Sequence, residues 1–158
     1  QDGVKADVLN VLPQMRAGAL AVQTGLANAN ARWCHVNFLN FESTAAKDVH
    51  VIGDSIQVAT GMPKSGHMAN AQAKVTAAAI VAELQGLEIN PQPMLTNVCL
   101  SYVDQAQAIH VASVHEYLHD KKSSVPVAGS GGVPAPRSAQ EAQNAEAWAH
   151  NIWADTLK

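Results

Sequence analysis

Residues 62–75 read MPKSGHMANAQAKV, in which a loop with proline and glycine leads directly into an alanine-rich segment. That segment continues to Gly86, a residue typical of helix ends. Its apolar residues recur at helical spacing and predict one packing face, made of Ala73, Ala77, Ile80, Val81 and Leu84. Because many of its side chains are small, the helix can approach a sheet or a ligand closely. The stretch therefore predicts a long, closely packed helix that begins near His67.

The short apolar run before this loop ends in a carboxylate. Residues 50–54 read HVIGD, a brief predicted strand, and open α/β sheets bind their ligands at the carboxyl ends of strands. A Gly-Asp pair alone is more typical of a plain turn. The neighbouring helix start favours a site, because its free N–H groups and partial positive charge stabilise an anion. We therefore expect Gly53, Asp54 and residues 64–67 to contact a ligand.

Composition excludes several classes of protein. The chain has 158 residues and is 47% hydrophobic, enough for one core or two small lobes. Its net charge is only -3 with 15% charged residues, so it lacks the basic surface that binds nucleic acid. No apolar run approaches the roughly 18 residues that cross a bilayer. The amino end has no signal-peptide pattern, so we expect a mature or truncated chain.

The amino-terminal half contains weaker signals of secondary structure. Residues 4–11 alternate loosely and are rich in aliphatic side chains, which predicts a strand that ends before Pro13. Gly25 and residues 28–30 have turn chemistry. Residues 33–41 are a candidate short strand or hairpin arm.

The carboxyl-terminal part predicts two strands and a helix. Residues 95–102 and 108–117 are separated by a short polar turn, which favours antiparallel pairing. Residues 121–137 have the composition of a long surface loop that does not fold on itself. Residues 138–141 read SAQE, a capping box that predicts a helix start at Ser138. Its inward face is predicted as Ala142, Ala145, Ala149, Ile152 and Trp153, with Trp148 at the edge.

Cysteines and histidines give no metal motif. Cys34 and Cys99 are too few for a disulfide framework, and although they could pair, composition favours two buried thiols. His115 and His119 are four residues apart, a spacing that shares a face only on a helix. Since their segment is predicted as strand and turn, we expect no metal site.

Longer motifs carry a family resemblance. They are residues 50–54 with 62–75, Gly25-Leu26, Trp33-Cys34 with Val36, Phe41-Glu42-Ser43, Thr96-Asn97-Val98-Cys99, and Trp148 with Asn151-Ile152 and Asp155-Thr156. Together they resemble the flavoprotein subunit of the flavocytochrome c sulfide dehydrogenases. The resemblance spans nearly all of this chain, whereas the family's protein is more than twice as long. No Gly-x-Gly-x-x-Gly turn for the FAD pyrophosphate occurs here, so we expect an amino-terminal part of the flavoprotein outside this sequence.

The resemblance implies a fold of mixed α/β and α+β class. Residues 1–90 would be the returning half of a glutathione-reductase-like FAD domain. Residues 91–158 would be a carboxyl-terminal interface lobe with antiparallel strands and a terminal helix.

It also implies roles for particular residues. Cys99 would be the second member of a redox-active cysteine pair near the flavin, with its partner in the amino-terminal part, while Cys34 would be structural. The FAD would be lined by Gly53, Asp54, Lys64, Ser65, Gly66 and His67. His67 could donate to the isoalloxazine ring or shuttle a proton. Trp148 would lie between the flavin and the haem subunit, although packing is the usual role of a tryptophan on such a helix.

The implied activity is that of a periplasmic sulfide:cytochrome c oxidoreductase, which passes electrons from sulfide through FAD to a c-type haem subunit. The closest rival is a quinone-linked sulfide oxidoreductase, which needs an amphipathic membrane anchor. Residues 140–158 lack the basic residues and broad apolar face of such an anchor. A further rival is a non-catalytic binding or scaffold module, which a complete and flavin-free chain would favour.

Overall fold

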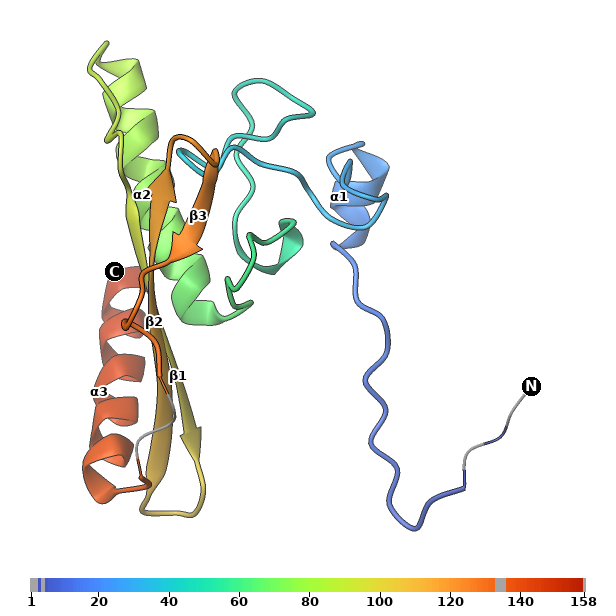
Figure 1. Cartoon of the computed structure of the whole chain (residues 1–158), viewed down its shortest axis with the longest axis vertical. Coiled ribbons are helices and arrows are strands. Elements are labelled where there is room, and N and C mark those ends of the chain that lie inside the picture. Colours follow the sequence, from blue (N-terminus) through green and yellow to red (C-terminus); the bar gives the residue numbers. More distant parts are fainter. Residues whose placement is uncertain (1–2, 4, 133–135, 158) are drawn as a thin grey trace.

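The computed structural model describes residues 3, 5–132 and 136–157. Its elements in chain order are α1 (Ala19–Gln23), the 3-10 helix η1 (Gly53–Ser55), α2 (Gly66–Leu84), β1 (Met94–Tyr102), β2 (Ala108–Leu118), β3 (Ser123–Pro126) and α3 (Ala139–Thr156). The three strands form one antiparallel sheet in the order β1-β2-β3 (Figure 1). The predicted α+β lobe with antiparallel strands and a terminal helix is confirmed.

The sheet has a core face and a face that α3 covers. Leu95 pairs with His115 across β1 and β2, and side chains directly opposite each other share a face. This face is buried in the core cluster, which contains Val36, Phe38, Phe41, Ile56, Ala59, Met62, Met68, Leu95 and Tyr117. On the other face, His110 Nδ1 lies 2.8 Å from Glu141 Oε2 of α3, and the Tyr102 hydroxyl donates to the Ala142 carbonyl at 3.1 Å.

Helix α2 has the predicted position but not the predicted packing face. Ser65 caps it, because its hydroxyl oxygen accepts from the Met68 N–H at 3.1 Å, and Gly86 follows its end with φ +67°. Its buried residues are Met68, Gln72, Thr76 and Ala79, whereas the predicted Ala77, Val81 and Leu84 are exposed. Alanines surround the helix, so the apolar pattern does not mark a single side. The side is set instead by the contacts with β1 and η1.

The segment between α1 and α2 is mostly irregular. The strand predicted at residues 50–52 is wrong, since His50 makes only an isolated antiparallel bridge to Glu42. Residues 33–41 likewise contribute isolated bridges, Cys34 to Ile56 and Val36 to Ser43. Backbone bonds between loops, such as Gln57 N–H to the Cys34 carbonyl at 2.8 Å, hold this segment together. The predicted turn at Gly25 is confirmed, with φ +75° after α1.

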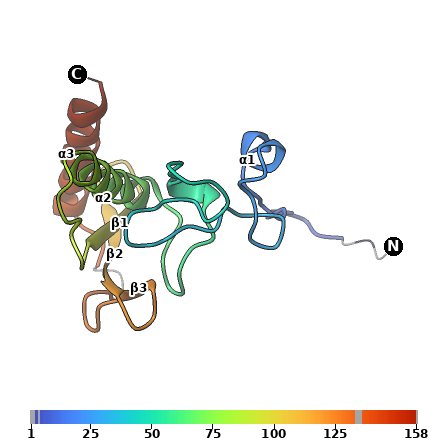
Figure 2. The same ribbon diagram turned by 90° about the horizontal axis from the view of Figure 1, so that it is seen from above.

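The strand predicted at residues 4–11 is also wrong over residues 5–11; Val4 lies outside the described residues. A strand needs a neighbour to receive its backbone hydrogen bonds, and no described residue pairs with this segment. Figures 1 and 2 show the chain before α1 extending away from the sheet and the long helices.

The segment of residues 121–137 does fold back, contrary to the loop prediction. Strand β3 pairs with the end of β2, from Leu118 with Ser123 to His115 with Pro126. A four-residue strand between turn-forming residues gives too weak a sequence signal to distinguish it from loop. Residues 133–135 of the predicted loop lie outside the described residues.

Helix α3 begins where the capping pattern predicts, but the cap is not reciprocal. The Ser138 hydroxyl oxygen accepts from the Glu141 N–H at 3.1 Å, whereas the Glu141 carboxylate turns to His110 and the Ser138 N–H donates to the Ala108 carbonyl. Ala142, Ala145, Ala149 and Ile152 are half-buried as predicted, and Trp153 is 55% exposed instead of packed inward. In the described part of the chain, no helix has the length and hydrophobicity to span a membrane.

Candidate functional site

A groove of about 310 Å³ lies at the free edge of β1, between the start of α2 and the middle of α3. It is lined by Ser65, Gly66, His67, Val98, Cys99, Leu100, Tyr102, Ala145, Trp148 and Ala149. Five of the residues predicted to form the site are among them: Ser65, Gly66, His67, Cys99 and Trp148. Residues that are distant in the sequence therefore meet at one place.

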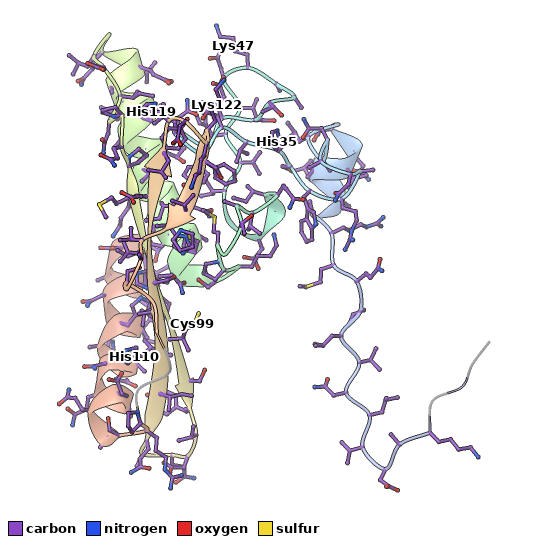
Figure 3. The ribbon with its side chains drawn as sticks, in the orientation of Figure 1. His35, Lys47, Cys99, His110, His119 and Lys122 are labelled. Carbon is purple, nitrogen blue, oxygen red and sulfur yellow. The ribbon has the colours of Figure 1, made fainter. Side chains whose placement is uncertain are left out.

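Cys99 is a half-buried free thiol on β1. It shares the core face with Asn97 and opposes Val111 on β2. Figure 3 shows its sulfur projecting from the strand on the side away from α3. Asn97 Nδ2 lies 3.5 Å from the sulfur and donates to it. The thiol is accessible enough to react and is held by a neighbouring amide.

The His67 side chain makes a hydrogen bond with the backbone at the free edge of β1. Its Nδ1 accepts from the Val98 N–H at 2.9 Å, so the neutral ring carries its proton on Nε2. Burial lowers the pKa of His67, the hydrogen bond with the Val98 backbone partly offsets this, and the charge of Lys74 adds a smaller lowering. A neutral ring with this tautomer is a hydrogen-bond donor at Nε2. It is not placed to take up a second proton easily.

Trp148 reaches from α3 to the start of α2. Its ring lies 5.7 Å from the His67 ring, centroid to centroid, with the planes tilted by 48°. The tryptophan is half-buried and lines the groove with Ala145 and Ala149 of the same helix. It therefore forms a wall of the groove while part of its ring stays accessible to another molecule.

Gly53, Asp54 and Lys64 do not line this groove. The Lys64 ammonium donates to the carbonyls of Asp54 at 2.5 Å and Ile56 at 2.9 Å, and it lies 3.9 Å from the centre of the Trp33 ring. Burial lowers the pKa of Lys64, partly offset by the charge of Asp54. Lys64 thus ties η1 to the loop before α2, and the exposed Asp54 carboxylate faces solvent beside it.

Two buried amides hold this arrangement, and sequence reasoning missed both. Gln72 is 1% exposed, and its Oε1 accepts from the Gly53 N–H at 2.7 Å. Asn97 is 5% exposed, accepts from the Ser65 hydroxyl and donates to Cys99. The period of two along a strand could have placed Asn97 on the same face as Cys99. No local pattern links Gln72 to Gly53, because that contact is tertiary.

Cys34 matches its predicted structural role, as it is fully buried. Burial raises the pKa of its thiol, and the nearby Lys64 lowers it by less. A buried, protonated thiol is a poor nucleophile. Among the residues that the structure describes, no three His, Cys, Asp or Glu side chains gather as they would around a metal ion.

Residues 91–157 match a protein-family model described as flavocytochrome c sulphide dehydrogenase, flavin-binding. The sheet and α3 lie within this matched range. Over these residues the chain is similar to the flavoproteins of the flavocytochrome c sulphide dehydrogenases. The matched range includes Cys99 and Trp148, and the groove is completed by residues 65–67 from the preceding helix start.

The groove fits the ring system of a flavin. The N–H groups of Gly66 and His67 have no acceptor among the described residues, and they begin the 19-residue helix α2. Together with the Nε2 proton of His67, they would be the donors available to a bound flavin ring, which gains negative charge on reduction. The apolar walls from Val98, Leu100 and Trp148 suit a flat ring.

Proposed function

We propose that this chain is part of a sulfide:cytochrome c oxidoreductase, in which sulfide is oxidised through a redox cysteine pair and FAD and the electrons pass to a haem c subunit. The observation that carries the proposal is the convergence of Cys99, residues 65–67 and Trp148 on one groove, with Cys99 and Trp148 inside the matched family range. A reactive sulfur, a helix start suited to an anionic ring and an aromatic wall are thus adjacent.

Each residue has a task in this proposal. Cys99 is the catalytic sulfur: hydrosulfide bonds to it and breaks the disulfide of the cysteine pair, and the other cysteine leaves as a thiolate. When the pair closes again, the substrate leaves as sulfur, its proton passes to solvent and its two electrons would pass to the flavin. Residues 66 and 67 donate hydrogen bonds to the flavin ring, which supplies a two-electron acceptor when bound. Gly53 and Asp54 contact the remainder of the cofactor from η1, with Lys64 fixing that turn. His67 stays neutral and orients the ring with its Nε2 proton.

The partners follow from the same proposal. An amino-terminal part of the flavoprotein supplies the FAD pyrophosphate turn and the second cysteine, with residues 1–90 completing its FAD domain and residues 91–158 forming the interface lobe. Trp148 faces the c-type cytochrome subunit. The assembly works in the periplasm.

The test is Cys99→Ser in the complete enzyme, which contains the amino-terminal part and the haem subunit. We expect sulfide oxidation to be lost while the visible spectrum still shows bound flavin, because serine retains the shape but not the sulfur chemistry. Cys34→Ser is the matched control and should retain turnover, since Cys34 is buried away from the groove. Turnover that survives Cys99→Ser would make Cys99 a structural thiol.

A further inference from the structure

Asn97 connects the helix start to the cysteine sulfur. Its side chain is 5% exposed and lies on the same face of β1 as Cys99, two residues away. The Ser65 hydroxyl donates to its Oδ1, and its Nδ2 lies 3.5 Å from Cys99 Sγ. A strand neighbour two residues away normally contacts a side chain by packing alone, whereas this one makes a directed hydrogen bond.

The Asn97 amide has a different partner at each end. The Ser65 hydroxyl oxygen already accepts from the Met68 N–H as the cap of α2, so its proton is free to be donated. The Asn97 Oδ1 receives this proton, which leaves the NH₂ group toward Cys99. The contact of Sγ with Oδ1 is longer, at 4.0 Å. The sulfur of Cys99 is therefore the acceptor in this pair.

We propose that Asn97 is the positioning residue for Cys99: its amide holds the sulfur in one orientation at the border of the groove and donates to it as negative charge develops there. This inference rests on the proposed role of Cys99 as the reactive sulfur. Through Ser65, the same amide fixes the sulfur relative to the first turn of α2, whose N–H groups border the groove. Two hydrogen bonds of the Asn97 side chain thus connect the sulfur to the helix start.

The test uses thiol reactivity, which requires neither flavin nor sulfide. Iodoacetamide is the probe: the Cys99 sulfur bonds to its carbon, iodide leaves and the thiol proton passes to solvent. Mass spectrometry of the peptide that contains Cys99 gives the alkylation rate of this cysteine alone. The buried Cys34 therefore does not have to be replaced. Asn97→Asp keeps the shape and the acceptor for Ser65 but removes the donor, and we expect alkylation about fivefold slower, the factor for one hydrogen bond.

Ser101→Asp is the matched control. Ser101 also lies two residues from Cys99 on the same face of β1, is exposed, and has no side-chain hydrogen bond within the described ranges. It introduces the same charge without removing a donor. We expect a change of less than about twofold at neutral pH in moderate salt, which screens an exposed charge. Equal slowing by Asn97→Asp and Ser101→Asp would overturn the proposal, because charge alone would then explain the effect.

A spectroscopic measurement covers the case in which Asn97 variants fail to fold. The Raman S–H stretching band of Cys99, identified by its loss in Cys99→Ser, reports hydrogen bonding at the sulfur in the unaltered chain. Because the Cys99 sulfur accepts from Asn97 and its own S–H does not donate to the amide, we expect the band at the position of a thiol that donates no hydrogen bond. A band lowered as in an S–H donor would mean that Cys99 donates to Asn97 Oδ1, and it would overturn the inference. Loss of sulfide oxidation plays no part in either readout, so this failure is distinct from a failure of the proposed function.

Discussion

Replacing Gln72 by methionine should destabilise the chain by about 2 kcal/mol, because the Gly53 N–H would lose its acceptor in a partly buried place. The bond it makes with Gln72 Oε1 is short, at 2.7 Å, and the glutamine side chain is 1% exposed. Methionine has nearly the same length and volume, so it leaves no cavity. The effect then reports the lost bond to Gly53 together with the weaker one that Gln72 Nε2 donates to Met62 Sδ at 3.6 Å.

The magnitude follows from the cost of an unpaired donor. A buried polar group left without its partner costs about 1–3 kcal/mol, and water reaches this site only in part. In a chain of 158 residues, a loss of about 2 kcal/mol lowers the melting temperature by about 4–8 °C. Gly53 has φ +72°, a conformation open to glycine. The Lys64 ammonium also restrains this turn through the Asp54 and Ile56 carbonyls, so the turn should persist in the variant.

Urea unfolding followed by circular dichroism gives the change in free energy of unfolding. Gln85→Met is the matched control, because Gln85 is exposed at the end of α2 and makes no side-chain hydrogen bond within the described ranges. Its effect should stay within about 0.5 kcal/mol. If Gln72→Met changes the stability no more than Gln85→Met does, α2 does not hold the Gly53 turn and our account of η1 is refuted.

Three further predictions concern the cofactor, pH and the partner. Residues 1–158 expressed alone should not retain FAD in a titration, because no pyrophosphate turn is present in this sequence; submicromolar binding would contradict the proposed division of the site. Burial lowers the pKa of His115 below its ordinary 6.5, so the unfolded chain binds that proton first, and stability should be full above about pH 6.5 and fall below it. Between pH 8 and pH 5, the melting temperature should fall less with pH in His115→Gln than in His119→Gln, whose histidine is exposed. An equal fall in the two variants would refute this. Trp148→Ala should slow haem reduction in stopped-flow after sulfide addition by more than it lowers the melting temperature of the complex, because the ring borders both the groove and the accessible surface. Unchanged haem reduction with a lowered melting temperature would leave Trp148 a packing residue.

Elements set by neighbouring residues could be predicted from the sequence. The start of α3 follows from Ser138, and the β1–β2 hairpin follows from two apolar runs with a short polar turn between them. Contacts between residues far apart in the sequence, which compete with such local interactions, could not be predicted. Glu141 is placed to complete its own cap but pairs with His110 on the sheet, since a charge-assisted bond to a half-buried ring is available there. The packing face of α2 was wrong for the same reason, because tertiary contacts choose among its many alanines.

In the candidate site, too, some residues could be predicted from the sequence and others could not. Motif resemblance was sufficient to name Cys99, His67 and Trp148, which the structure brings together at one groove. It could not supply the two amides that connect distant elements, since neither Asn97 nor Gln72 belongs to a local pattern of chemistry. Their partners lie 32 and 19 residues away in the chain.

The groove also crosses the border of the matched family range. Residues 91–157 provide Cys99, Trp148 and the edge of β1, but the donors at the helix start come from residues 65–67. His67 Nδ1 receives the Val98 N–H, and Ser65 binds Asn97, so the edge of β1 and the start of α2 satisfy each other's polar groups. Without α2, that edge would present an open donor and the core face around Leu95 would lose Met68. The smallest unit that can present this groove therefore begins before α2, not at residue 91.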